Sequence, residues 1–218
     1  MSTSPNKPSI KQQRAASREA KLVEYRRQQA RAARNRKLAI GGGVLGGVAV
    51  VALIATTVIL TPKPVTYATN SGKTVQGVAT FTNDAAHTTA TVNYEQTPPA
   101  GGPHDPVWLN CGVYTETQRS ENAVHAQEHG AVWVTYDPAL PEADIAAIRA
   151  KLPSTYVIMS PFPGLENPVT LSAWNAQLSL DKIDDPRFEE FFEAYWKSNA
   201  VPEPGSPCTG GITGPGAA

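Results

Sequence analysis

Cysteine is scarce in this sequence, and so is charge. Only two cysteines occur among 218 residues, charged residues make up 17%, and 19 basic residues balance 19 acidic ones. This composition excludes highly charged disordered proteins, coiled coils and collagen-like chains. The length allows one domain of ordinary size with an anchor, but not two large domains.

Sequence motifs for nucleotide and thiol chemistry are also missing. The chain has no P-loop, no G-x-G-x-x-G after a strand, no G-x-S-x-G and no C-x-x-C. We therefore expect no nucleotide cofactor and no thioredoxin-type chemistry.

The zero net charge hides two parts of opposite sign. Residues 1–37 hold 11 basic and 2 acidic residues, whereas residues 38–218 hold 8 and 17, so the parts carry +9 and −9. The second part begins with an uncharged apolar run at residues 38–60. As a helix this run would be roughly 34 Å long, which is enough to cross a hydrocarbon core of about 30 Å.

The apolar run could be an anchor or a cleaved signal peptide. A signal peptide usually has an apolar stretch of about 7 to 15 residues after a short basic start, and here a longer run follows 37 residues. We therefore expect a cytoplasmic segment over 1–37, a transmembrane helix over 38–60 and an extracytoplasmic C-terminal part, because positive charge normally stays in the cytoplasm. The basic residues expected at the membrane surface are Arg26, Arg27, Arg31, Arg34, Arg36 and Lys37.

The N-terminal part could have two further partners, nucleic acid and another membrane subunit. Its charge could bind nucleic acid, but a topology signal already accounts for the charge, so we expect no nucleic-acid partner. In the span, Gly42/Gly46 and Gly43/Gly47 repeat at a spacing of four, which would permit close packing with another membrane subunit. Glycine is also simply common in membrane spans, and we favour that explanation.

Beyond the span, composition divides the chain into three parts. We predict a linker over residues 61–74, an extracytoplasmic domain over 75–200 and a Pro/Gly-rich tail over 201–218. The domain pattern predicts an α+β fold, with one mixed sheet covered by two or three helices. Strands are expected over residues 75–81, 88–94, 131–136, 155–159 and 169–180, the last interrupted at 175–177. Helices are expected over residues 121–128, over 141–152 and after Asp185, where an aromatic stripe indicates core packing.

Cys111 and Cys208 both follow the span, where oxidising conditions let disulfides persist. We predict that they pair, which would tie the tail to the domain; an intermolecular pair or free thiols are the alternatives.

All four histidines lie between residues 87 and 129, and the segment from His125 to His129 reads H-x-x-E-H. On a helix, positions i and i+4 lie about 6 Å apart on one face, so two imidazoles could bind one ion. The candidate ligands for copper or zinc are His87, His104, His125, His129 and Glu128. The same motif occurs in zinc peptidases, which need a further carboxylate, for which Glu189, Glu190 or Glu193 could serve. A purely structural role is the other alternative: His104 held by backbone hydrogen bonds, His129 at a helix end, and Glu128 paired with a cation.

The pattern of residue types in the C-terminal part resembles that of one known bacterial family, the domain of unknown function 3105. The resemblance covers about residues 80–208 and is carried by Tyr94, Pro98, Pro99, Gly102, Pro103, His104, Trp108, Cys111, Gly112, Tyr114, Glu121, Val124, His125, Glu128, His129, Gly130, Thr135, Tyr136, Pro138, Trp174, Phe191, Tyr195, Pro202, Glu203, Pro204, Gly205 and Cys208. The chain differs from that pattern at Gly101 and Gln127, where Ser and Leu are usual. The resemblance implies one N-terminal span and a site that includes His87, His104, His125 and His129, and it implies no established activity.

These observations favour a single-pass protein of the bacterial cell membrane whose histidine cluster binds copper or zinc for sensing, storage or delivery. We favour a role that is not enzymatic. The alternatives are a non-catalytic accessory or scaffold subunit of a membrane complex and, third, a zinc hydrolase.

Overall fold

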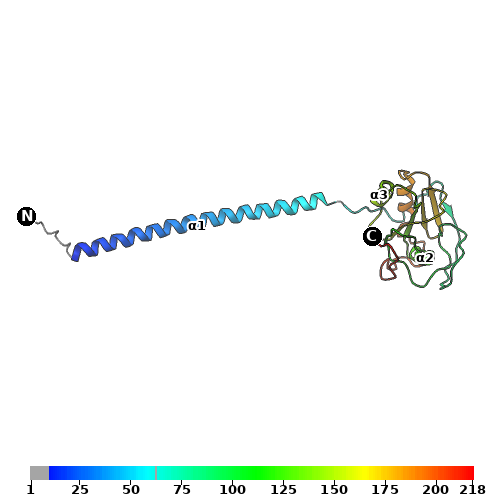
Figure 1. Cartoon of the computed structure of the whole chain (residues 1–218), viewed down its shortest axis with the longest axis horizontal. Helices are drawn as coiled ribbons and strands as arrows, with labels where there is room; N and C mark the ends of the chain where they lie inside the picture. Colours follow the sequence, from blue (N-terminus) through cyan, green and yellow to red (C-terminus); the bar gives the residue numbers. More distant parts are fainter. Residues whose placement is uncertain (1–9, 62) are drawn as a thin grey trace, which may run out of the picture. The chain divides into compact units, whose positions relative to one another are not determined.

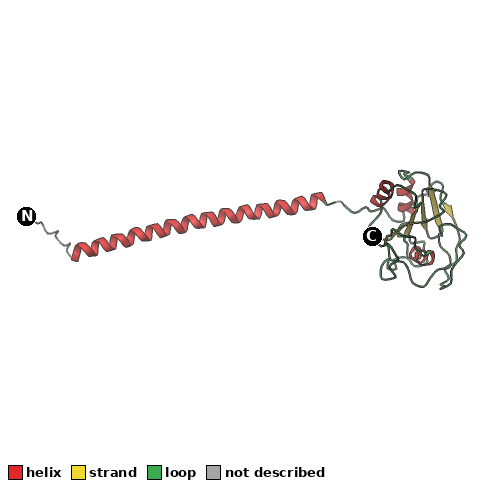
Figure 2. Cartoon of the chain, in the orientation of Figure 1, coloured by secondary structure: helices red, strands yellow, loops and turns green. Residues whose placement is uncertain are grey.

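The computed structural model describes residues 10–61 and 63–218, which divide into two compact units between Lys63 and Pro64. The first unit contains one helix, α1 (Ile10–Leu60), and the second is an α+β domain (Figures 1 and 2).

α1 joins the basic segment and the apolar run in one helix of 51 residues, without a break at Lys37. The helix is long and apolar enough to cross a membrane, by length and composition. Its large apolar side chains, such as Leu45 and Ile59, are exposed over most of their area. A continuous apolar surface of this kind marks an interaction site with lipid or protein.

The domain is built on one six-stranded mixed sheet in the order β1-β6-β5-β3-β4-β2. The strands are β1 (Ala79–Thr80), β2 (Gly112–Val113), β3 (Val132–Tyr136), β4 (Val157–Pro161), β5 (Val169–Ala173) and β6 (Ala176–Leu180). Strands β3, β4 and β2 run parallel, and α3 (Glu142–Ala150) connects β3 to β4. Strands β5 and β6 form an antiparallel hairpin whose turn contains Asn175 at a φ of 62°. An interruption was expected at 175–177; the turn lies at 174–175 instead, and residues 176 and 177 already pair in β6. Asn175 suits the turn because Asn tolerates the left-handed conformation that tight hairpins need.

Both faces of the sheet are covered, as alternation along β3 shows. Val132, Val134 and Tyr136 belong to one apolar cluster, whereas Trp133 belongs to the other. The first cluster contains Phe188, Phe191 and Phe192 from α4 (Arg187–Tyr195), which confirms that the aromatic stripe is core packing. The second contains Ala123 and Ala126 from α2 (Ser120–Glu128). The expected mixed sheet with helices packed on it is therefore confirmed.

Two of the expected strands are wrong or too long. Residues 88–94 form a loop, and only Ala79–Thr80 of the segment 75–81 pairs with the sheet. In the loop the N–H of Thr88 donates to the carbonyl of His104 (2.7 Å) and the N–H of Val92 donates to Oε1 of Glu121 (2.9 Å). Because these backbone groups find partners in other loops and a helix, the segment does not join the sheet.

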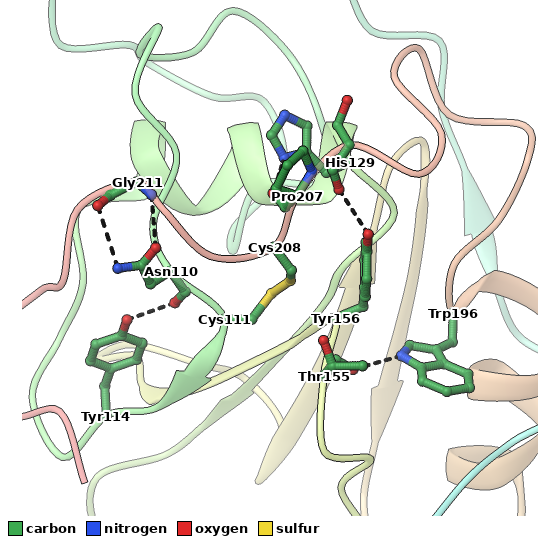
Figure 3. Close-up of a disulfide and its surroundings, with 11 residues drawn as sticks. Asn110, Cys111, Tyr114, His129, Thr155, Tyr156, Trp196, Pro207, Cys208 and Gly211 are labelled. Atoms are coloured by element: carbon green, nitrogen blue, oxygen red, sulfur yellow. Dashed lines mark hydrogen bonds between the residues drawn. A yellow bond between two sulfur atoms is a disulfide. The ribbon is translucent and has the colours of Figure 1, made fainter.

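The C-terminal tail packs against the domain although it forms no regular element. Its Cys208 is disulfide-bonded to Cys111, as predicted, with the two Cα atoms 5.4 Å apart (Figure 3). Further along, Ile212 bridges Leu109 and Ala217 bridges Tyr114. The tail therefore runs beside the segment 109–114 over a considerable length.

Near the N-terminal boundary of the domain, Tyr67 from the expected linker stacks on Phe192.

We expect the disulfide to contribute strongly to the stability of the domain, because it closes a loop between cysteines 97 positions apart. In the chain-entropy model, replacing both cysteines by serine lowers the free energy of unfolding by up to about 4 to 5 kcal/mol. Urea denaturation of residues 64–218, followed by tryptophan fluorescence, measures the change. An unchanged midpoint in the double variant would contradict this expectation.

Candidate metal centre

Three separate segments bring the histidines together. His87 and His104 lie on two loops joined by a short parallel bridge, in which the N–H of His104 donates to the carbonyl of Ala86 (2.9 Å). His125 lies in α2, and His129 is the residue that ends this helix. His87 lies directly before the segment 88–94, which was expected to be a strand and forms a loop.

α2 places His125 and His129 next to each other, with their ring centroids 4.7 Å apart. The helix ends because Gly130 follows with a φ of 99°, and a Cβ atom there would lie 3.2 Å from the Cα of Lys197. A side chain at this position would be strained on both counts. The structure thus confirms that the H-x-x-E-H segment is helical and that its two imidazoles lie on one side.

Four side chains form a first group, which we call the inner cluster: His87, His104, His125 and Glu128. Oε2 of Glu128 lies 2.8 Å from Nε2 of His104, 3.6 Å from that of His87 and 4.0 Å from that of His125. Two ligands of a tetrahedral zinc ion lie on the order of 3.3 Å apart when each bond is about 2.0 to 2.1 Å. The observed distances bracket this value, so the cluster has suitable dimensions for one ion.

The three buried histidines are each oriented by a backbone carbonyl. Nδ1 of His104 lies 2.8 Å from the oxygen of Gly102, Nδ1 of His125 lies 2.6 Å from that of Asp105, and Nδ1 of His129 lies 2.8 Å from that of Pro207. A carbonyl oxygen only accepts hydrogen bonds, so Nδ1 must donate its proton in every case. Nε2 is then the atom with a free lone pair in the neutral ring. Metal-binding histidines are commonly held in this way.

The hydrogen bonds of these histidines agree only in part with those expected if their role were purely structural. His104 does donate to a carbonyl in its proline-rich loop, as that alternative expected. The ring of His129, however, donates to Pro207 and not to a carbonyl at the end of its own helix.

Glu128 is a buried carboxylate among imidazoles, with 4% of its side chain exposed. Within residues 10–61 and 63–218, its ion-pair partners are all histidines, and it pairs with neither lysine nor arginine. Burial lowers the pKa of His125, as do the neighbouring rings of His104 and His129, although the hydrogen bond with Asp105 opposes this. The neutral form of His125 is therefore favoured, and it does not balance the carboxylate charge. A buried carboxylate without a balancing cation is costly.

A second group, the outer cluster, consists of His125, His129 and Glu203. Nε2 of His129 lies 3.3 Å from Oε2 of Glu203, whose side chain is 48% exposed. Sequence reasoning did not nominate Glu203 as a ligand, although it lies in the Pro202–Gly205 segment that the family pattern singled out. In the tail, the N–H of Glu203 donates a hydrogen bond to the carbonyl of Glu128 (3.2 Å), which brings Glu203 to the site.

The carboxylates nominated for a peptidase site lie elsewhere. Glu189, Glu190 and Glu193 are on α4, and Glu193 is bonded to Lys73. Neither of the metal-ligating groups found among the described residues includes them.

Aromatic and charged side chains hold the loops around the clusters. The indole of Trp108 lies 5.1 Å from the ring of His129 and 5.7 Å from that of His125, between ring centroids, and Trp174 lies 5.7 Å from His104. Arg119 bonds to the carboxylate of Asp105 (2.6 Å). Burial alone would raise the pKa of Asp105, but the N–H of Val107 and the Arg119 guanidinium together lower it.

Gly101 and Gln127, the two positions at which the chain departs from the pattern it resembles, are bonded to each other. The N–H of Gly101 donates to Oε1 of Gln127 (2.9 Å), and Nε2 of Gln127 donates to the carbonyl of Pro99 (3.0 Å). This pair joins the proline-rich loop that carries His104 to α2.

We expect Glu128→Gln to stabilise the domain when no metal is bound. Nδ1 of His104 donates to the carbonyl of Gly102, so an amide at position 128 can donate to Nε2 of His104, whereas the carboxylate cannot. The gain should be about 1 kcal/mol or more, because a buried charge is removed. Thermal or urea unfolding in excess EDTA measures it, with exposed Glu142→Gln as the control. A less stable Glu128→Gln protein would instead indicate an ion pair between Glu128 and a protonated histidine.

The sequence was also compared with known proteins. The family described as "Protein of unknown function (DUF3105)" matches residues 86–210, a range that contains both clusters and both cysteines. Neither a curated protein nor a solved structure matches the chain. Because the match extends over more than half of the sequence, the chain belongs to the DUF3105 family.

Proposed function

We propose that this protein binds one divalent transition-metal ion, copper or zinc, in the inner cluster, and that it stores or delivers the ion outside the cytoplasm. The observation that carries the proposal is the orientation of the buried imidazoles. His104 and His125 each donate Nδ1–H to a backbone carbonyl, which turns Nε2 toward the carboxylate of Glu128, 2.8 Å away in the hydrogen bond with His104 and 4.0 Å away from His125.

A metal cation would balance the negative charge of the buried Glu128 carboxylate in the inner cluster. In His104 and His125 the ring proton is on Nδ1, so in the neutral rings Nε2 presents a lone pair that repels the carboxylate. One added proton between His104 and Glu128 would satisfy that pair alone. A metal ion would satisfy all of the facing atoms together, because each offers one ligand atom within 4.8 Å of the others.

The ligand set favours a divalent ion. Three nitrogens and one carboxylate oxygen suit Zn(II) and Cu(II), whereas Cu(I) prefers thiolate and thioether sulfur. Both cysteines are in the disulfide, and Met159 lies in the core on β4. Copper(II) should bind more tightly than zinc at such a site.

The same ligand set supports retention of the ion more than catalysis. Four protein ligands fill a tetrahedral shell, while catalytic zinc sites usually keep one position for water. In a zinc peptidase the motif glutamate acts as a free base. Here Oε2 of Glu128 lies among three imidazoles, so it is not free for that role.

The membrane arrangement forms the second part of the proposal. The basic residues before Leu38 support a cytoplasmic N terminus, in contact with anionic headgroups. The disulfide supports an oxidising location for the domain.

Metal binding is tested with the full-length protein, purified in detergent without a histidine tag. We expect one copper or zinc ion per chain, with a Kd below about 10 μM. Glu128→Gln and His87→Ala should each lower the affinity by about 10-fold or more, because each removes a ligand. Glu142→Gln, which changes an exposed glutamate in the same way, should have no effect. Elemental analysis and titration calorimetry measure these values; if neither ion binds, the accessory-subunit function replaces this proposal.

Topology is tested by adding protease to intact spheroplasts that express the protein with an N-terminal tag. The domain should be degraded while the tag survives, because the basic flank keeps the N terminus inside. Immunoblots against the tag and the domain report the result. Loss of the tag with survival of the domain would show the opposite orientation.

A further inference from the structure

We infer that the outer cluster is a second position for the same ion, and that the ion enters and leaves the inner cluster through it. This inference rests on the proposed metal-binding function. It starts from His125, which belongs to both clusters.

His125 can serve only one ion at a time. Its Nδ1 is occupied by the hydrogen bond to the carbonyl of Asp105 (2.6 Å), so Nε2 is its only ligand atom. One lone pair binds one ion, and the two positions therefore cannot both be filled with His125 as a ligand. When the ion moves between the two positions, its bond to Nε2 of His125 is kept and only its other ligands are exchanged.

The two positions differ in the number of ligands that they offer. The inner cluster has four, of which His104, His125 and Glu128 are each at most 5% exposed and His87 is 46% exposed. In the outer cluster, His129 is buried but Glu203 is 48% exposed. Three ligands also leave one position free in a tetrahedral shell. A donor or acceptor molecule could therefore add its own ligand to the ion at the outer cluster.

The outer cluster is held in place by independent contacts. The ring of His129 is oriented by the carbonyl of Pro207, next to the disulfide at Cys208 (Figure 3). The hydroxyl of Tyr156 donates to the carbonyl of Ser206 (2.8 Å), and the N–H of Cys111 donates to that of Cys208 (2.7 Å). These contacts fix the tail segment that carries Glu203. The disulfide therefore maintains the outer position as well as the stability of the domain.

Tryptophan side chains lie beside both clusters. The ring centroid of Trp108 is 5.1 Å from that of His129 and 5.7 Å from that of His125, and the centroid of Trp174 is 5.7 Å from that of His104. Copper(II) bound nearby quenches tryptophan emission, so its uptake can be followed by fluorescence.

The test compares exchange rates in the full-length protein in detergent, after loading with one copper(II) or zinc ion. Release is measured with excess EDTA, and uptake by stopped-flow fluorescence. In Glu203→Gln, both rates should fall by at least about 10-fold, so that Kd changes much less than either rate. Glutamine keeps the size of the side chain, and Glu142→Gln is the matched control. His129→Gln should slow exchange in the same way.

Two results would overturn the inference while the proposed function stands. One is exchange at the wild-type rate in both Glu203→Gln and His129→Gln, which would place entry at half-exposed His87. The other is tight binding of two ions per wild-type chain, which would make the clusters independent. If the wild-type protein binds no ion at all, the proposed function fails and the inference fails with it.

Discussion

The buried carboxylate of Glu128 faces the imidazoles of His87, His104 and His125, and this contact organises one side of the domain. A buried anion is costly unless it is balanced, and among the described residues neither lysine nor arginine pairs with Glu128. The three imidazoles lie on three different segments. Those of His104 and His125 are turned toward Glu128 by hydrogen bonds to backbone carbonyls of the loop 102–105.

The two faces of the sheet have separate roles. The face covered by α4 contains the large apolar cluster, with three buried phenylalanines, and supplies most of the hydrophobic stabilisation. The face covered by α2 is smaller and contains Trp133, Ile158 and the disulfide cysteine Cys208. Helix α2 packs its alanines on that face and carries His125 and Glu128 in the same nine residues. A short helix can thus hold two ligands rigidly, because almost all of its surface is buried.

Local patterns predicted the features that depend on near neighbours. Helix α2, helix α4 and strands β3, β4, β5 and β6 follow from spacing along the chain, and two cysteines in one domain have a single intrachain pairing. The same patterns failed at residues 88–94, where alternating Thr and Val indicated a strand. The backbone of that segment is satisfied by His104 and by the side chain of Glu121, which lie in other parts of the chain. Propensity describes a residue's preference, but partners distant in sequence decide whether a strand forms.

The sequence by itself predicted an apolar helix before one α+β domain, a bond between Cys111 and Cys208, and a shared side for His125 and His129 if their segment is helical. Each of these depends on composition or on spacing over a few residues. Only the tertiary structure decided which atoms meet: that Glu128 lies among three imidazoles, that His125 belongs to two clusters, and that Glu203 returns from the tail to His129. In the sequence, the further carboxylates nominated as ligands were Glu189, Glu190 and Glu193 of α4, and Glu203 was not among them. The disulfide and the packing of the tail bring Glu203 to the site instead, and contacts of this range leave no local pattern.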